Sequence, residues 1–251
     1  MTTYDLSTRT AVVTGAASGM GAATARLLAA SGARVALVAR RQDRLDELAA
    51  SIGDLALPVA ADVTDTASIE AARDTIHTAF GRVDLVVSAA GVMLPNPITD
   101  GRDDEWTRMI ETNLHGPLRI VQAFTPDLVA AAAEGLTADL VTISSVAAHI
   151  ALPEYAVYNA TKAALTHLTG SLRPELGPKN VRVSNIEPGL TRTELGDHID
   201  NTGHAESLAG TFDVLRPLEP EDVADVIAYL TSRPSHVNLR QGILVPTHQP
   251  T

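Results

Sequence analysis

Short apolar segments alternate with longer amphipathic ones along most of the chain. Several of the apolar segments are almost uninterrupted, which is typical of parallel strands that are buried on both faces. Seven of these segments predict strands: Thr10–Gly15, Ala33–Ala39, Ala56–Val63, Val83–Ala89, Ala138–Ser145, Val181–Pro188 and Gly242–Pro246. Six segments between them have the periodicity of helices: Met20–Ser31, Arg41–Ile52, Thr66–Phe80, Asp103–Glu134, Tyr155–Leu176 and Glu221–Ser232.

The regular alternation of these elements predicts the fold class. Successive strand–helix–strand units form right-handed crossovers, and they build one parallel sheet that is covered by helices on both faces. We therefore expect a single doubly wound α/β domain of the Rossmann type over residues 1–251, with a seven-stranded sheet. Residues 190–214 interrupt the alternation, because they are polar and contain glycine. A segment of that length predicts a substrate loop or lid.

Composition narrows the range of partners. The net charge is −11, which argues against nucleic acid or an anionic membrane as a partner. The absence of cysteine excludes disulfides, thiolate catalysis and cysteine zinc sites. The histidines have no compact ligand spacing, so no metal is expected. Neither a signal-like segment nor an apolar run of about 18 residues is present, and a cytoplasmic protein is expected.

The segment "TGAASGMG" joins the first predicted strand to the first predicted helix. Gly15 can make a tight turn, Gly19 lets backbone amides approach a pyrophosphate, and Gly21 lets the helix pack closely. The loop therefore predicts a dinucleotide-binding site made by Gly15, Ala17, Ser18, Gly19, Met20 and Gly21. Its spacing differs from the usual G-x-G-x-x-G, and a purely structural turn is the alternative.

The residues after the second predicted strand bear on the choice of cofactor. In proteins that bind NAD, an acidic residue about 20 positions beyond the glycine loop binds the ribose 2′-hydroxyl. Here Ala39 stands near that place and is followed by Arg40 and Arg41, whose guanidinium groups suit the 2′-phosphate of NADP. NADP(H) is therefore favoured. NAD(H) is the alternative, because Asp43 and Asp46 could partly neutralise solvated arginines.

A serine, a tyrosine and a lysine form the candidate catalytic set. Tyr158 and Lys162 are four residues apart in a predicted helix and therefore share a face. A neighbouring ammonium lowers the pKa of a phenol, whose usual value is about 10, and makes it useful for proton exchange. Ser145 ends the fifth predicted strand, at the sheet edge where ligands bind. Such a tyrosine–lysine pair also arises by chance in many helices. The presence of Ser145 and of the glycine loop in the same chain favours the catalytic interpretation.

With these motifs the sequence resembles the short-chain dehydrogenase/reductase family over essentially its whole length. The interval of 13 between Ser145 and Tyr158 also matches. Within the family, "DEWTRMIETNL" and "VPTHQP" resemble an NADP-dependent branch that includes clavulanate-aldehyde reductase and serine dehydrogenase-like enzymes. The remaining motifs that carry the resemblance are Asp62–Val63, "SAAG" (88–91), Asn113 in "ETNLHG", "YNATK" (158–162) and "EPGLTRT" (187–193).

The resemblance implies an oxidoreductase that transfers a hydride between NADP(H) and a carbonyl or alcohol. Tyr158 would be the general acid or base, Ser145 would polarise the carbonyl, and Lys162 would lower the tyrosine pKa and bind the nicotinamide ribose. Asn113 would hold a water of a proton relay. A dinucleotide-binding regulator without turnover is the alternative from another class. Further implied cofactor contacts are Asp62 and Val63 with adenine, Ala90 and Gly91 with ribose, and Pro188, Gly189, Thr191 and Thr193 with nicotinamide.

Three further expectations concern the helices and the substrate. Pro117 has no N–H to bond the carbonyl of Asn113, so we expect a kink that frees this carbonyl for the relay water, or a kink that only fits the packing. The alanine-rich faces of Asp103–Glu134 and Tyr155–Leu176 suit a homodimer or homotetramer. The substrate is expected to be a neutral carbonyl or alcohol, because the predicted pocket is apolar: Met93, Leu94, Ser145, His149, Leu152, Tyr155 and Leu190.

Overall fold

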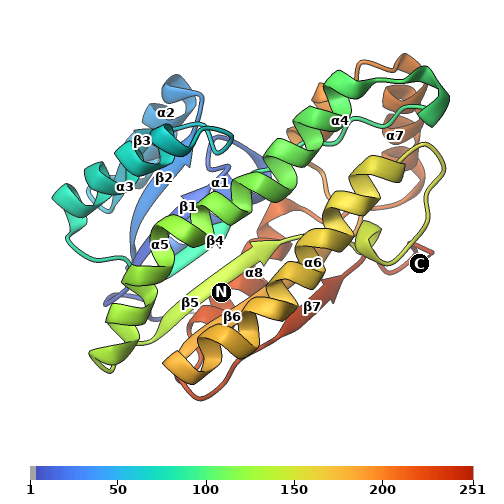
Figure 1. Ribbon diagram of the computed structural model, residues 1–251. Helices are drawn as coiled ribbons and strands as arrows, with labels where there is room; N and C mark the ends of the chain where they lie inside the picture. Colours follow the sequence, from blue (N-terminus) through green and yellow to red (C-terminus); the bar gives the residue numbers. More distant parts are fainter. Residues whose placement is uncertain (1–3, 251) are drawn as a thin grey trace.

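The computed structural model describes residues 4–250. Within this range the chain forms one seven-stranded parallel sheet with the order β3-β2-β1-β4-β5-β6-β7 (Figure 1). This arrangement confirms the predicted fold class. The strands are β1 (Thr10–Thr14), β2 (Arg34–Ala39), β3 (Ala56–Ala60), β4 (Leu85–Ser88), β5 (Ala138–Ile143), β6 (Val181–Pro188) and β7 (Gln241–Leu244).

The central strands are buried along their whole length, as the uninterrupted apolar segments predict. Every residue of β1, β4, β5 and β6 is buried. Val12 of β1 pairs with Ala36 of β2 on one side and with Val86 of β4 on the other. Successive strands are added on one side of β1 up to β3 and on its other side from β4 onward, so the strand order reverses between β1 and β4. In open α/β sheets a ligand binds at this point, beyond the carboxyl ends of the strands.

Helices cover both faces of the sheet. Helices α1, α2 and α8 pack on one face, where Leu28, Leu45 and Ile227 share a core with β1 and β2. Helices α3, α5 and α6 pack on the other face, and the long α5 and α6 run side by side across it (Figure 1). The helices are α1 (Gly19–Ala30), α2 (Gln42–Ile52), α3 (Thr66–Phe80), α4 (Asp103–Ile110), α5 (Gly116–Ala133), α6 (Ala156–Leu176), α7 (Thr202–Val214) and α8 (Pro220–Thr231).

The predicted helix Asp103–Glu134 is not a regular α-helix. A π-helical turn, Glu111–His115, separates α4 from α5, and the N–H of Gly116 bonds the carbonyl of Glu111 five residues back. Pro117 follows directly and has no N–H to offer the carbonyl of Asn113. The helix therefore contains a wider turn directly before Pro117, and such turns are frequent at functional sites. The predicted kink stays a prediction.

Residues 190–214 contain more regular structure than their polar sequence predicts. A 3-10 helix, Glu194–His198, is followed by α7, which lies beside the beginning of α4 at one end of the molecule (Figure 1). Asp200 pairs with Arg102 at 3.0 Å. The segment therefore packs as a short helical layer rather than as an extended loop. Among residues 4–250, no helix is long and apolar enough to cross a membrane.

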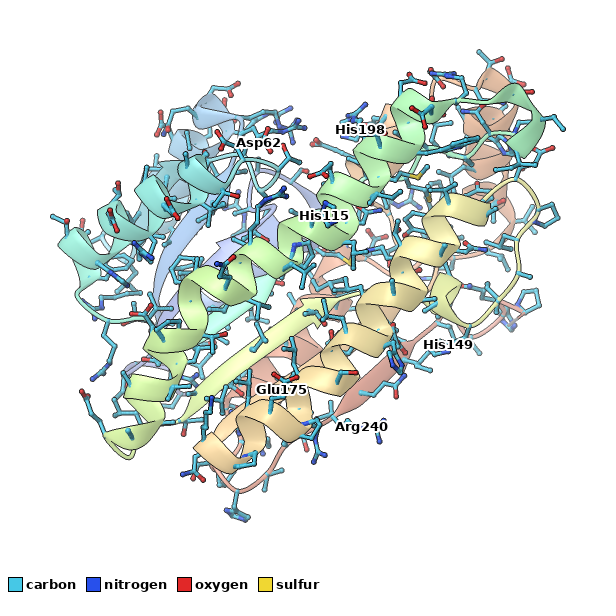
Figure 2. The ribbon with its side chains drawn as sticks, viewed as in Figure 1. Asp62, His115, His149, Glu175, His198 and Arg240 are labelled. Carbon is cyan, nitrogen blue, oxygen red and sulfur yellow. The ribbon has the colours of Figure 1, made fainter. Side chains whose placement is uncertain are left out.

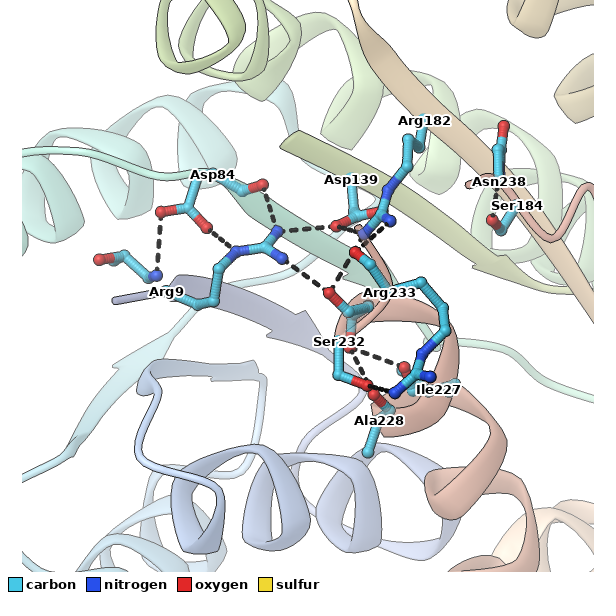
Figure 3. Close-up of polar contacts among 12 residues, drawn as sticks. Arg9, Asp84, Asp139, Arg182, Ser184, Ile227, Ala228, Ser232, Arg233 and Asn238 are labelled. Atoms are coloured by element: carbon cyan, nitrogen blue, oxygen red, sulfur yellow. Dashed lines mark hydrogen bonds and ion pairs between the residues drawn. The ribbon is translucent and has the colours of Figure 1, made fainter. Parts of the chain in front are cut away.

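A network of buried charges joins the sheet at the amino ends of its strands, away from the predicted site (Figure 3). Arg9 donates to Asp84 at 2.6 Å and to Asp139 at 2.8 Å. Arg182 donates to both carboxylate oxygens of Asp139, each at 2.7 Å, and also to the carbonyl of Thr231. Because each charge has an opposite partner and several hydrogen bonds, the cost of burying it is offset.

Candidate active site

The glycine loop forms a backbone cradle at the carboxyl end of β1. Gly15 and Gly19 have φ values of 66° and 50°, which are accessible to glycine without the penalty that a Cβ brings. A Cβ on Gly21 would collide with the carbonyl of Gly15, and one on Gly15 would lie 2.9 Å from the backbone of Ala90. The glycines therefore let the loop pack closely against the start of α1 and the segment after β4. The cleft beside the loop is lined by Gly15, Ser18, Gly19 and Gly21 at the N-terminus of α1, a place that suits a phosphate of a dinucleotide.

The cleft continues from the glycine loop over the ends of β2 and β3. Arg40, Arg41, Asp62 and Val63 line this part together with residues of the glycine loop. Figure 2 shows Asp62 on one rim of the cleft and His198 on the other. The predicted strand Ala56–Val63 in fact ends at Ala60, so Asp62 lies in the loop beyond the sheet. The structure thus brings together the residues that we expect around an adenosine.

Tyr158, Lys162 and Ser145 meet where the cleft joins a second cavity. Lys162 is buried on α6, and its Nζ donates to the carbonyl of Ile143 at 3.2 Å and lies 5.7 Å from the ring centroid of Tyr158. Ser145 lies after β5 and accepts from the N–H of Ala147 at 3.1 Å. Tyr158 lines both the cleft and the second cavity. The predicted catalytic side chains therefore converge on one place.

The pKa of Tyr158 moves opposite to the expected direction. Burial raises the pKa of this phenol to about 12, although the nearby Ser145 hydroxyl favours the phenolate. Burial also lowers the pKa of Lys162 to about 8. Desolvation of the phenolate dominates the pKa of Tyr158 in this geometry, and the expected lowering of that pKa by the Lys162 ammonium stays a prediction. Tyr158 is fully protonated at neutral pH.

Asn113 lies in the π-helical turn and is completely buried. Its Oδ1 accepts from the N–H of Val92, and its Nδ2 donates to the carbonyl of Val92, both at 2.8 Å. Nδ2 also lies 3.2 Å from the hydroxyl of Thr161 on α6. The side chain therefore connects the turn, the segment after β4 and the helix of Tyr158 and Lys162. The role of its backbone carbonyl in a relay stays a prediction.

The second cavity, of about 190 Å³, lies beyond Tyr158 and has a largely apolar lining. The predicted residues Met93, Ser145, Leu152, Tyr155 and Leu190 all line it. The predicted nicotinamide contacts Pro188, Gly189, Thr191 and Thr193 also line this cavity. Of these, Thr193 lines the cleft as well, as does Met20.

Two predicted pocket residues lie elsewhere. The imidazole Nε2 of His149 is 2.9 Å from a carboxylate oxygen of buried Glu187, and its side chain is 43% exposed (Figure 2). His149 is therefore directed away from the cavity by an interaction that its sequence position does not reveal. Leu94 is buried against Met109 and Tyr158 in a small core, so it supports the site from behind.

Residues 190–214 were predicted to form a substrate loop or lid, but the residues of this segment that line the cavity were not predicted individually. Leu195, Leu208 and Phe212 come from the 190–214 segment. Leu208 and Phe212 are four residues apart, which places them on one face of α7, and this spacing was the available signal. Glu194 and His198 of the preceding 3-10 helix line the cleft, and no local pattern indicates that position.

Comparison with known proteins agrees with this geometry. A model of the short chain dehydrogenase family matches residues 9–203. An uncharacterized oxidoreductase of Staphylococcus epidermidis is 35% identical over 238 residues, covering 95% of this chain and 97% of that protein.

Solved structures give the same result. The closed form of serine dehydrogenase complexed with NADP+ has a TM-score of 0.89 at 30% identity, covering 96% of each chain. A 3-ketoacyl-(acyl-carrier-protein) reductase from Brucella melitensis complexed with NADH has a TM-score of 0.85 at 29% identity, covering 94% of this chain and 96% of that chain. The chain therefore belongs to the short-chain dehydrogenase family and is an NAD(P)-dependent oxidoreductase.

Proposed function

We propose that the protein is an NADP(H)-dependent oxidoreductase that acts on a neutral, largely apolar ketone, aldehyde or secondary alcohol. One observation carries this proposal: the Tyr158 side chain forms the wall shared by the dinucleotide cleft and the apolar cavity. A proton donor in that position is next to both compartments between which a hydride would pass. The bound nicotinamide would supply or accept that hydride.

The protein side chains supply the proton chemistry. The Tyr158 hydroxyl is protonated at neutral pH and lies at the wall shared by the cleft and the cavity, so it would serve as the general acid in carbonyl reduction. Ser145 lines the same cavity and offers a second hydroxyl to the substrate oxygen. Lys162 lies on the cleft side, where its ammonium would hold the nicotinamide ribose. In the oxidative direction Tyr158 must first lose its proton.

The cavity lining supports a neutral substrate. No charged side chain lines it within residues 4–250. A carboxylate or ammonium that entered would lose hydration without gaining an ionic partner, which is costly. Leu208 and Phe212 cover the cavity from α7, and we infer that residues 190–214 act as a lid over the substrate.

The two arginines after β2 support NADP(H). Arg40 and Arg41 are exposed and line the adenosine part of the cleft, where they could contact a 2′-phosphate with charge-assisted hydrogen bonds. NAD(H) is the second candidate, because Arg41 is already paired with a carboxylate of Glu194 at 3.0 Å. Dissociation constants of NADPH and NADH separate the two, and a clear preference for NADH would reject the first.

Turnover of a carbonyl panel with NADPH tests the proposed reaction. We expect oxidation of NADPH with apolar ketones or aldehydes, and no measurable turnover in Tyr158→Phe, whose NADPH affinity should be close to that of the wild type. Tyr229→Phe is the matched control, because Tyr229 is an exposed tyrosine of α8. Substantial turnover in Tyr158→Phe would contradict the assigned proton donor.

A further inference from the structure

The 3-10 helix Glu194–His198 at the beginning of the lid lies over the dinucleotide cleft. Glu194 and His198 both line the part of the cleft beside the glycine loop. His198 also lines the adenosine part, together with Arg40 and Arg41. This turn of the lid therefore contacts both ends of the cleft, although about 150 residues separate it from the arginines in the sequence.

An ion pair joins the lid to Arg41, one of the two arginines that line the adenosine part of the cleft. The Nη2 of Arg41 is 3.0 Å from Oε2 of Glu194, and the two side chains are 44% and 39% exposed. His198 lies close to the same positive charges. Burial lowers the pKa of its imidazole, and the guanidinium groups of Arg108, Arg40 and Arg41 lower this pKa further. The carboxylate of Asp197 raises it. Glu194 is thus a carboxylate placed among cations.

The only chemical difference between NADP(H) and NAD(H) is the 2′-phosphate on the adenosine ribose. A phosphate monoester carries close to two negative charges at neutral pH, and its oxygens suit the two-pronged geometry of a guanidinium. The carboxylate of Glu194 accepts a hydrogen bond from the Nη2 of Arg41 and so engages one of the donors that a phosphate would use. A 2′-phosphate that binds Arg41 must displace this carboxylate or remain beside it at a cost of like-charge repulsion. A ribose 2′-hydroxyl meets neither cost.

We propose that Glu194 is a cofactor-selectivity residue, which competes with the 2′-phosphate for Arg41 and thereby weakens the preference for NADP(H) over NAD(H). This inference rests on the proposed function, because it assumes that the arginines receive the 2′-phosphate. It assigns to the lid a part in choosing the cofactor in addition to covering the substrate. Ala39 leaves the end of β2 without an acid, and the lid brings a carboxylate to the same region from a distant part of the chain.

Direct binding measurements test the inference without turnover. Titration with NADPH and with NADH is followed by calorimetry for the wild type, Glu194→Gln and Glu206→Gln. An exposed ion pair contributes modestly, so we expect the dissociation constant of NADPH to fall about two- to fivefold in Glu194→Gln and that of NADH to stay unchanged. Glu206→Gln is the matched control, because it removes the same charge from an exposed lid residue outside the cleft lining. It should change neither constant.

The role of Arg41 is tested by combining substitutions. In an Arg41→Gln background, Glu194→Gln should no longer tighten NADPH, because the group for which the two anions compete is gone. The inference is overturned if Glu194→Gln changes both cofactors equally, changes neither, weakens NADPH, or keeps its full effect without Arg41. If the wild type binds NADPH and NADH but the variants give one of these results, only this inference fails and the proposed function stands. A wild type that binds neither cofactor overturns both.

Discussion

Lys162 offers a test of how far the site is built at the expense of stability. Its ammonium is buried, and the one protein acceptor that it contacts within residues 4–250 is the carbonyl of Ile143 at 3.2 Å. An ammonium has three donors, so burial is poorly compensated. Replacing Lys162 with methionine keeps an unbranched side chain in the same space and removes the charge. We expect the variant to be inactive and more stable than the wild type.

The magnitude follows from the pKa. A fall from 10.5 to about 8 for Lys162 corresponds to about 3 kcal/mol against the charged form, at about 1.4 kcal/mol for each pKa unit. The variant also loses the hydrogen bond to Ile143, which lowers its free energy of unfolding by about 1 kcal/mol. The net gain in the free energy of unfolding at pH 7 is then about 2 kcal/mol, or about 4–8 °C in Tm for a chain of this size.

Thermal unfolding followed by circular dichroism measures this gain. Lys179→Met is the matched control, since Lys179 is the other lysine of the chain and is exposed; its Tm should stay near that of the wild type. A lower Tm for Lys162→Met, with Lys179→Met unchanged, would refute the reasoning. It would show that the ammonium stabilises the folded protein.

The pH dependence of the difference gives an independent check. Below pH 8 both the folded and the unfolded states hold the proton on Lys162, so the folded state bears the full cost of the buried charge. Between about pH 8 and 10.5 the folded state has already released its proton while the unfolded state has not, and the cost declines. The advantage of Lys162→Met should therefore shrink as the pH rises through this range and vanish above it.

Three further predictions concern the proton donor, the glycine loop and the buried charges. Because burial raises the pKa of Tyr158, initial rates between about pH 6 and 10 should rise with pH for alcohol oxidation but not for reduction; a flat oxidation profile would contradict its role as the base. Gly21→Ala should destabilise the fold by about 1–3 kcal/mol and weaken NADPH binding, whereas Gly170→Ala, where a Cβ meets nothing within 4 Å, should do neither. Arg182→Met should lower the free energy of unfolding by about 3–5 kcal/mol, since it leaves the buried Asp139 short of a partner; denaturant titration would measure this, and a loss below 1 kcal/mol would show that Arg9 alone suffices.

The sheet was predictable because its evidence is local. Uninterrupted apolar segments and the helical periodicity between them are visible in any short window of sequence, and they defined the seven strands to within a few residues. The convergence of Ser145, Tyr158 and Lys162 followed from the rule that parallel strands end at one edge. The fold and the centre of the candidate site were therefore readable from the chain.

What was missed depends on contacts between distant residues. His149 is directed by Glu187, which is 38 positions away, and the pair of Arg41 with Glu194 spans 153 positions. Helix α7 lies in a polar segment with glycine, so its packing residues are hard to distinguish from loop residues. The predicted homodimer or homotetramer stays a prediction, and sedimentation would test it.

The network of Arg9, Asp84, Asp139 and Arg182 has a consequence for redesign of the enzyme. It joins four neighbouring strands at the end of the sheet opposite to the substrate cavity. One end of the sheet therefore holds the strands together, and the other end carries the candidate site. Loops and lid residues around the cavity can be exchanged without touching the groups that hold the strands in register. Libraries that vary Leu152, Leu208 or Phe212 should therefore yield a high share of folded variants, and new substrates can be sought there first.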